Sequence, residues 1–201
     1  MSVNIRYFAS LQSPWTYLGH DRFYDLIARH GATAVCKPVD FGKIFSVSGG
    51  LPLGQRAEQR QAYRLADLTR WRDHLGLELN LHPKHFPTSE LAAAHMVTAH
   101  VQQGGDAGQF ASAILRAVWA DEKDISDKTV LLELADQSGV NGAALLAKVE
   151  QPETVAAHEA NTQEAIDLGV FGAPTYDFEG ELFWGQDRLD LLDRALSLRS
   201  G

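Results

Sequence analysis

Hydrophobic and polar positions alternate along residues 3–8, and this alternation predicts a β-strand. Directly after it, apolar residues recur at helical spacing and predict a helix over residues 14–30. Pro14 suits the first position of this helix, and Ser13 suits its N-cap. A glycine then ends the helix, and residues 33–39 form an apolar run typical of a second strand. The N-terminal part of the chain therefore predicts a β-α-β unit.

Between residues 45 and 151 the hydrophobic pattern takes a period of 3.6 residues, which is typical of amphipathic helices. Towards the C-terminus a further helix precedes a predicted hairpin around Glu179-Gly180-Glu181 and a final amphipathic helix. The predicted helices after residue 45 cover residues 55–75, 90–103, 109–120, 130–135 and 154–168.

The β-α-β unit at the start and the α-β-β-α unit at the end can share one sheet, which is thioredoxin topology. We therefore expect an α/β protein with a thioredoxin-like fold and a large α-helical insertion. Residues 1–44 and 152–201 would form the discontinuous thioredoxin-like domain, and residues 45–151 would form the insert, a lid over the active edge of the sheet. In this topology Pro174 should start the third strand beside Ser13. A cis Ala173-Pro174 bond would expose the backbone groups of Ala173 to a peptide-like ligand.

The junction of the first strand and the first helix is where a thioredoxin-type fold carries its reactive sulfur. A dithiol enzyme would need a Cys-x-x-Cys pair at Ser13-Pro14-Trp15-Thr16, but the only cysteine of the chain is Cys36. Cys36 lies on an apolar strand without a basic neighbour in sequence, so we expect an inert core residue. A thiol that reacts at this junction must therefore come from outside the chain.

Composition and charge restrict the class of protein further. The 201 residues, 45% of them hydrophobic, suffice for a sizeable core. The net charge of -8 argues against binding to nucleic acids or anionic membrane surfaces. No signal peptide is apparent, no apolar run approaches the roughly 20 residues that span a bilayer, and one cysteine fits a reducing compartment, so we expect a cytoplasmic protein without a membrane partner. The eight histidines lack the spacing of a zinc site, and we expect no metal.

Five fragments of the chain are each weak evidence for a protein family, but their order and spacing together are fairly specific. They are Ser13-Pro14-Trp15-Thr16-Tyr17-Leu18-Gly19, Tyr63 with Asp67-Leu68 and Arg70-Trp71, Ala117-Val118-Trp119, Val170-Phe171-Gly172-Ala173-Pro174-Thr175, and Phe183-Trp184-Gly185-Gln186-Asp187-Arg188-Leu189. With these fragments the chain resembles, over nearly its whole length, the kappa-class glutathione transferases and the bacterial 2-hydroxychromene-2-carboxylate isomerases of the DsbA-like thioredoxin superfamily.

This resemblance implies glutathione as the cofactor and a homodimer as the assembly. It implies that the hydroxyl of Ser13 donates a hydrogen bond to the glutathione sulfur. A helix N-terminus and a hydroxyl donor both favour the anion of a thiol whose pKa is otherwise ~8.5. It further implies that the backbone of Ala173, held by Pro174, pairs with the cysteinyl part of glutathione. The remaining implied contacts are Gln186 and Asp187 to the γ-glutamyl end, and Tyr63, Asp67 and Arg60 from the insert.

The chain also departs from these families. The kappa class has an asparagine after the glycine that follows its Ile-Phe segment, whereas Ile44-Phe45 leads here to Gly49-Gly50, so we expect one contact to the peptide backbone to be missing. Residues 83–96, expected to line the pocket for a second substrate, do not match the isomerases of naphthalene degradation. Trp71, Trp119 and Trp184 are expected in the core or between subunits.

The resemblance implies an enzyme that interconverts 2-hydroxychromene-2-carboxylate and trans-o-hydroxybenzylidenepyruvate, or a close analogue from aromatic degradation, by reversible thiolate addition. A small aromatic molecule is the expected partner. Two alternatives stay open: a kappa-class-like glutathione transferase or peroxidase, in which the adduct leaves as product, and a binding module without catalysis that has lost its cysteines. The missing cysteine pair opposes a dithiol oxidoreductase.

Overall fold

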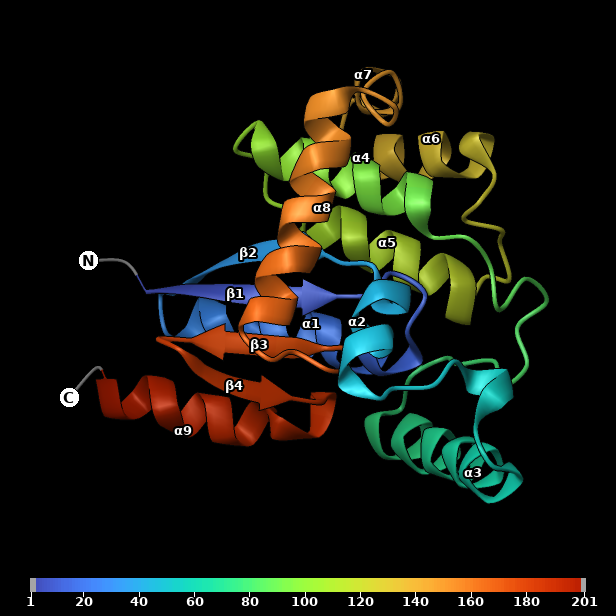
Figure 1. The fold of residues 1–201 in the computed structure, drawn as a ribbon, viewed down its shortest axis with the longest axis vertical. Coiled ribbons are helices and arrows are strands. Elements are labelled where there is room, and N and C mark those ends of the chain that lie inside the picture. The colour runs from blue at the N-terminus through green and yellow to red at the C-terminus, as the bar shows by residue number, and fades with distance from the viewer. Residues whose placement is uncertain (1–2, 200–201) are drawn as a thin grey trace.

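The computed structural model describes residues 3–199 and shows a four-stranded sheet with helices on both faces (Figure 1). The strands are β1 (Asn4–Ala9), β2 (Thr33–Pro38), β3 (Thr175–Phe178) and β4 (Glu181–Trp184), in the order β2-β1-β3-β4. The strands β1 and β2 are parallel, whereas β3 is antiparallel to both β1 and β4. The predicted thioredoxin-like fold with a helical insertion is confirmed.

The helices follow the predicted pattern, with ends displaced by no more than a few residues. The α-helices are α1 (Pro14–Arg29), α2 (Phe41–Ser48), α3 (Glu58–Leu75), α4 (Leu91–Gln102), α5 (Gly108–Trp119), α6 (Lys128–Gln137), α7 (Gly142–Leu146), α8 (Pro152–Asp167) and α9 (Leu189–Arg199), and two 3-10 turns cover η1 (Leu53–Gln55) and η2 (Gln186–Arg188). The sequence pattern did not predict α2 or α7. Both are short and begin at a side-chain cap, Asp40 for α2 and Asn141 for α7, rather than with an extended apolar stripe.

The two faces of the sheet are covered differently. On one face, Ile5 and Tyr7 belong to the large core shared with α1, α5 and α9, in which the Tyr7 ring stacks on Tyr176 at 5.3 Å between centroids. On the other face, Phe8 packs with Ile44 of α2 and Ala165 of α8 in a smaller cluster (Figure 1). The sheet is therefore enclosed by apolar contacts on both sides.

The helical segment between residues 45 and 151 does not lie as one lid over the edge of the sheet. Helices α4 to α7 continue the main core beside α1 and β2, and Phe110 and Trp119 of α5 are fully buried there with Ile5 and Tyr7. Helix α3 and the chain on either side of it lie beyond the end of the strands (Figure 1). Burial of apolar surface explains this placement, because α5 buries an apolar face that a mobile lid would expose.

Three sequence expectations concern single residues. Cys36 is buried, and burial raises the pKa of its thiol to about 12, so it stays protonated as expected of an inert core residue. Trp119 lies in the core as expected. Trp184, by contrast, is 51% exposed on the edge strand β4 and is no core residue of this chain. No helix within residues 3–199 combines the length and apolar character required to cross a bilayer.

A buried histidine makes the stability of this fold depend on pH. His158 of α8 is 5% exposed, its ring lies 5.0 Å from that of His95, and its Nε2 has no hydrogen-bond partner among residues 3–199. Burial, and secondarily the neighbouring His95, lower the pKa of His158 to about 4. The unfolded chain takes up a proton near pH ~6.5, whereas the folded chain resists it.

We expect the free energy of unfolding to fall by about 2–3 kcal/mol on this account as the pH drops from about 6.5 to about 4. Urea unfolding of the native protein and of His158→Phe at a series of pH values measures the contribution. The variant should lose less stability than the native protein over this range. Equal pH dependence of the two proteins would contradict the assignment.

Candidate active site

Ser13 caps the N-terminus of α1 at the end of β1. Its backbone is extended (φ -78°, ψ 129°), its Oγ accepts a hydrogen bond from the Thr16 amide at 3.3 Å, and Pro14 occupies the first turn. The Oγ accepts in this bond, and its own proton is donated to no residue between 3 and 199. The site therefore offers one free hydroxyl donor beside the positive end of a 16-residue helix, an arrangement that favours an anion.

A carboxylate from α4's N-cap holds the loop that leads to Ser13. Glu90 accepts hydrogen bonds from the Ser10 hydroxyl at 2.8 Å and from the Gln12 amide at 3.1 Å. Burial raises the pKa of Glu90, and the hydrogen bonds from Ser10 and Gln12 act in the opposite direction. No signal in the sequence pointed to Glu90, because its partners lie about eighty positions away along the chain.

The turn before β3 contains a cis Ala173-Pro174 bond, the isomer that the sequence left open. Phe8 of β1 faces Thr175 of β3, and the two strands are antiparallel, so the end of β1 and the start of β3 lie at the same edge of the sheet. The Gly185 amide donates to the Pro174 carbonyl at 2.9 Å. Neither the N–H nor the C=O of Ala173 is bonded to any residue between 3 and 199. Ala173 therefore presents two unpaired backbone groups at the edge where Ser13 caps α1.

Gln186 and Asp187 follow β4 at the same edge. Gln186 is 2% exposed, and its Oε1 accepts a hydrogen bond from Arg22 of α1 at 2.6 Å. A side chain at Gly19 would place its Cβ 2.7 Å from the Cβ of Gln186, so this glycine permits the close approach of α1. Asp187 is exposed and pairs with Arg188 at 2.6 Å. The buried glutamine thus fixes the turn that presents the Asp187 carboxylate.

The three predicted residues of the insert form no bond to this group within residues 3–199. Arg60, Tyr63 and Asp67 occupy one face of α3, where Tyr63 is 62% exposed and Asp67 lies 3.8 Å from Arg70. No hydrogen bond or ion pair within residues 3–199 joins them to Ser13 or to the turn at Ala173. The structure therefore brings five of the eight predicted residues to one edge, Ser13, Ala173, Pro174, Gln186 and Asp187.

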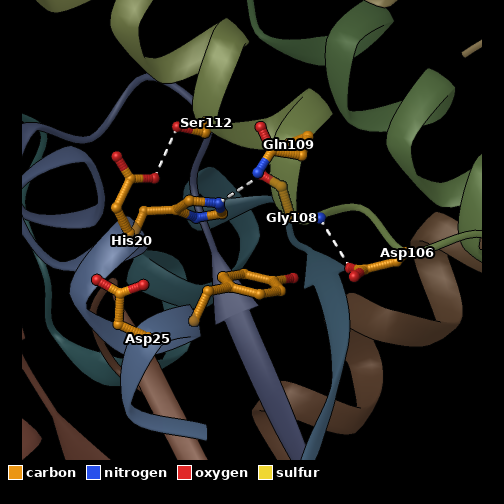
Figure 2. Close-up of a pocket in the computed structure, with 8 residues that line it drawn as sticks. His20, Asp25, Asp106, Gly108, Gln109 and Ser112 are labelled. Atoms are coloured by element: carbon orange, nitrogen blue, oxygen red, sulfur yellow. Dashed lines mark hydrogen bonds between the residues drawn. The ribbon is translucent and has the colours of Figure 1, made fainter. Parts of the chain in front are cut away.

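A second concave site lies between α1 and α5, about two turns along α1 from Ser13 (Figure 2). It has a volume of about 270 Å³ and three aspartates in its wall, Asp21, Asp25 and Asp106. At its base His20 contacts the Gly108 carbonyl at 2.9 Å, and burial lowers the pKa of His20. Three carboxylates disfavour an anionic ligand, so this pocket does not suit a thiolate. Within residues 3–199 no group of three or more His, Cys, Asp or Glu side chains could hold a metal ion.

A sheet of this order, a capped helix after β1 and a cis-proline turn opposite it define a thioredoxin-fold protein. A family model, the DSBA-like thioredoxin domain, matches residues 4–197, and the chain belongs to this family. A 2-hydroxychromene-2-carboxylate isomerase of Sphingobium xenophagum is 27% identical over 198 residues, which are 98% of this chain and 99% of the relative.

Solved structures show the same fold. The structure of a 2-hydroxychromene-2-carboxylate isomerase has a TM-score of 0.77 and 22% identity, covering 98% of this chain and 96% of that one. The cytosolic disulfide reductase DsbM from Pseudomonas aeruginosa with GSH has a TM-score of 0.66 and 16% identity, covering 98% of each chain. The resemblance to these isomerases that the sequence fragments suggested is confirmed.

The contacts of Glu90 yield a prediction for stability. Glu90→Ala leaves the Ser10 hydroxyl and the Gln12 amide without their acceptor, and we expect a loss of about 1–3 kcal/mol in the free energy of unfolding. The exposed Glu159, 3.5 Å from Lys43, is the matched control, and Glu159→Ala should change stability by no more than about 0.5 kcal/mol. Urea unfolding measures both, and equal effects would show that Glu90 does not hold the loop.

Proposed function

We propose that this protein is a glutathione-dependent isomerase. It would interconvert 2-hydroxychromene-2-carboxylate and trans-o-hydroxybenzylidenepyruvate, or a close analogue from aromatic degradation. Relatives with that isomerase name, 27% identical in Sphingobium xenophagum, support an isomerase. The observation that carries the glutathione dependence is the free hydroxyl donor of Ser13 at a helix N-terminus in a chain whose only thiol is buried elsewhere.

The residues at the edge fit glutathione in their chemistry. The unpaired N–H and C=O of Ala173 suit the backbone of a cysteinyl residue, which would add to the turn as a short strand does. The carboxylate of Asp187 suits the ammonium of a γ-glutamyl group. Arg60 and Tyr63 of α3 are exposed and Asp67 is half-buried, and these polar groups suit contacts to glutathione from the insert.

In the proposed reaction the bound cofactor supplies a thiolate that adds reversibly to a conjugated carbon, so that a double bond becomes a single bond with easy rotation. The protein supplies the conditions for this chemistry. The Ser13 hydroxyl and the first amides of α1 stabilise negative charge at one point. Glu90 keeps the Ser13 loop in place, and Ala173 orients a peptide backbone. No net oxidation occurs, so the chain needs no redox-active cysteine.

The proposal includes a cytoplasmic, homodimeric protein, which the resemblance implies. A cytoplasmic location agrees with the dependence on glutathione, and a lone buried cysteine is compatible with a reducing compartment. Light scattering after size exclusion measures the assembly, and a monomer at all accessible concentrations would remove the dimer from the proposal.

Substitution of Ser13 tests the proposal directly. Ser13→Ala and Ser13→Gly both remove the hydroxyl donor, and we expect each to lower the rate of chromene isomerisation by about 10–1,000-fold. At an N-cap, alanine lowers stability by about 1 kcal/mol, whereas glycine lowers it by only a few tenths. Equal losses of rate in the two variants would therefore come from the missing hydroxyl and not from reduced stability. Ultraviolet absorbance of the bound thiolate should show a raised pKa of the glutathione thiol in both variants.

Ser197→Ala is the control, because this exposed hydroxyl only contacts the Asp193 carbonyl within α9. It should leave the rate unchanged. The amount of glutathione during turnover distinguishes the reactions: an isomerase returns it, whereas stoichiometric consumption would replace the proposal with a transferase. Absence of glutathione binding in calorimetry would instead favour a binding module without catalysis.

A further inference from the structure

One arginine near the candidate active site carries a charge that the protein does not neutralise. Arg64 of α3 is half-buried, and its guanidinium forms no ion pair or hydrogen bond with any residue between 3 and 199. Burial, followed by the nearby Arg56, lowers the pKa of Arg64 to about 10, so it still carries its charge at neutral pH. In a protein with a net charge of -8, an unpaired and partly desolvated cation calls for a specific reason.

The guanidinium of Arg64 lines a cavity of about 280 Å³ between α3 and the segment that leads to α4. Most of the remaining wall is apolar, and Gln61 and His82 complete it; the apolar residues are Leu53, Leu65, Leu81, Pro83, Phe86 and Pro87. Binding cavities for small molecules begin at roughly 300 Å³, so this one suits a single substituted aromatic ring. An apolar wall that includes the Phe86 ring, with the Arg64 cation at its side, suits a conjugated molecule that carries one negative charge.

Aromatic rings hold Arg64 in this position. Its guanidinium carbon lies 5.4 Å from the centroid of Phe86 and 5.7 Å from that of Trp119. The stacking orients the planar guanidinium but leaves its N–H groups unused. An apolar side chain would pack on the two rings without the desolvation of a charge, so packing alone does not account for arginine here.

The same rings connect the cavity to the loop of Ser13. Trp119 contacts Phe86 at 4.8 Å between centroids, and its Nε1 donates to the carbonyl of Gln12 at 3.2 Å. The Thr88 amide donates to the side-chain oxygen of Gln12 at 3.3 Å. Trp119, which packs against the cavity residue Phe86, and Thr88, which follows the cavity residue Pro87, are therefore bonded to the residue that precedes Ser13. A molecule in the cavity would lie next to the edge where the thiolate is proposed to form.

Two further arginines lie close to Arg64 along the chain, and no carboxylate within residues 3–199 forms an ion pair with Arg64. Arg56 lies just ahead of α3, and its Nε donates to the Leu51 carbonyl, an uncharged group. Arg60, between them, has no ion-pair partner within residues 3–199. Residues 56–64 thus carry three arginines against one carboxylate, Glu58, and this local excess of positive charge in an acidic protein favours anions near the cavity.

We propose that Arg64 is the specificity-determining residue for the second substrate, and that it binds the carboxylate of a flat, conjugated acid whose ring lies in the cavity against Phe86. That this acid is the substrate of an isomerase rests on the proposed function. The preference of the cavity for a carboxylate does not rest on the proposed function. The closing experiment therefore measures binding without turnover.

The probes are trans-cinnamate and its uncharged analogue cinnamamide, titrated by calorimetry into the native protein, Arg64→Met and Arg72→Met. Methionine keeps an unbranched stem over the two rings and removes the charge. Arg72 lies on the same helix and pairs with its neighbour Asp73, so its loss controls for net charge. We expect the native protein and Arg72→Met to bind cinnamate at least about tenfold more tightly than cinnamamide, and Arg64→Met to lose this preference. Equal binding of both probes by the native protein, no binding of cinnamate, or a preference that survives in Arg64→Met would overturn the proposal.

Glutathione binding provides the separate readout. Arg64→Met should bind glutathione as the native protein does, which also shows that the variant is folded. In the isomerase assay its KM for the chromene should rise by about tenfold or more, and Arg64→Lys should recover part of that loss. If glutathione does not bind even to the native protein, the proposed function fails, and the two cinnamate probes still decide the role of Arg64.

Discussion

The antiparallel pairing of β1 with β3 is the constraint on which the candidate active site depends. It sets Phe8 opposite Thr175, so the chain leaving β1 and the chain entering β3 meet at one edge. Ser13 and the cis Ala173-Pro174 turn are close to each other in the fold for this reason, although they belong to opposite ends of the sequence. A shift of this register by one residue would turn each side chain of the strand to the other face and separate the two features.

Helices α4 and α5 of the insert support the loop before Ser13 and do not cover the edge. Helix α5 contributes Trp119, which is fully buried and yet donates a hydrogen bond to the backbone of Gln12. The N-cap residue of α4, Glu90, receives two further bonds from the same loop. The loop before Ser13 is therefore held by the hydrophobic core, which is a way to preorganise a site on rigid elements. Helix α3 contributes Leu68 to the same core and carries Arg60 and Tyr63 on its exposed face.

Local periodicity predicted what is local in this fold. The strand and helix that flank Ser13, the long helices of the insert and the hairpin at Glu179-Gly180 follow from spacing, caps and turn residues, and all were confirmed. The short α2 and α7 were missed because side-chain caps rather than an apolar stripe define them. The placement of the insert was also beyond local reasoning, because it follows from which faces bury most apolar area.

The residues of the candidate site likewise divide into those that the sequence could predict and those that it could not. Ser13 and Pro174 could be predicted because each belongs to a short contiguous fragment that has a fixed place in a thioredoxin-like fold. Glu90 and Arg64 could not, because a carboxylate satisfied by a distant loop, or a cation without a partner, exists only once the chain is folded.

A crystal structure of the protein with glutathione tests the central claim most directly. The account predicts the sulfur within hydrogen-bond distance of the Ser13 Oγ and the cysteinyl backbone paired with Ala173. Glutathione bound elsewhere, such as between α1 and α5, or with its sulfur directed away from Ser13, would contradict it.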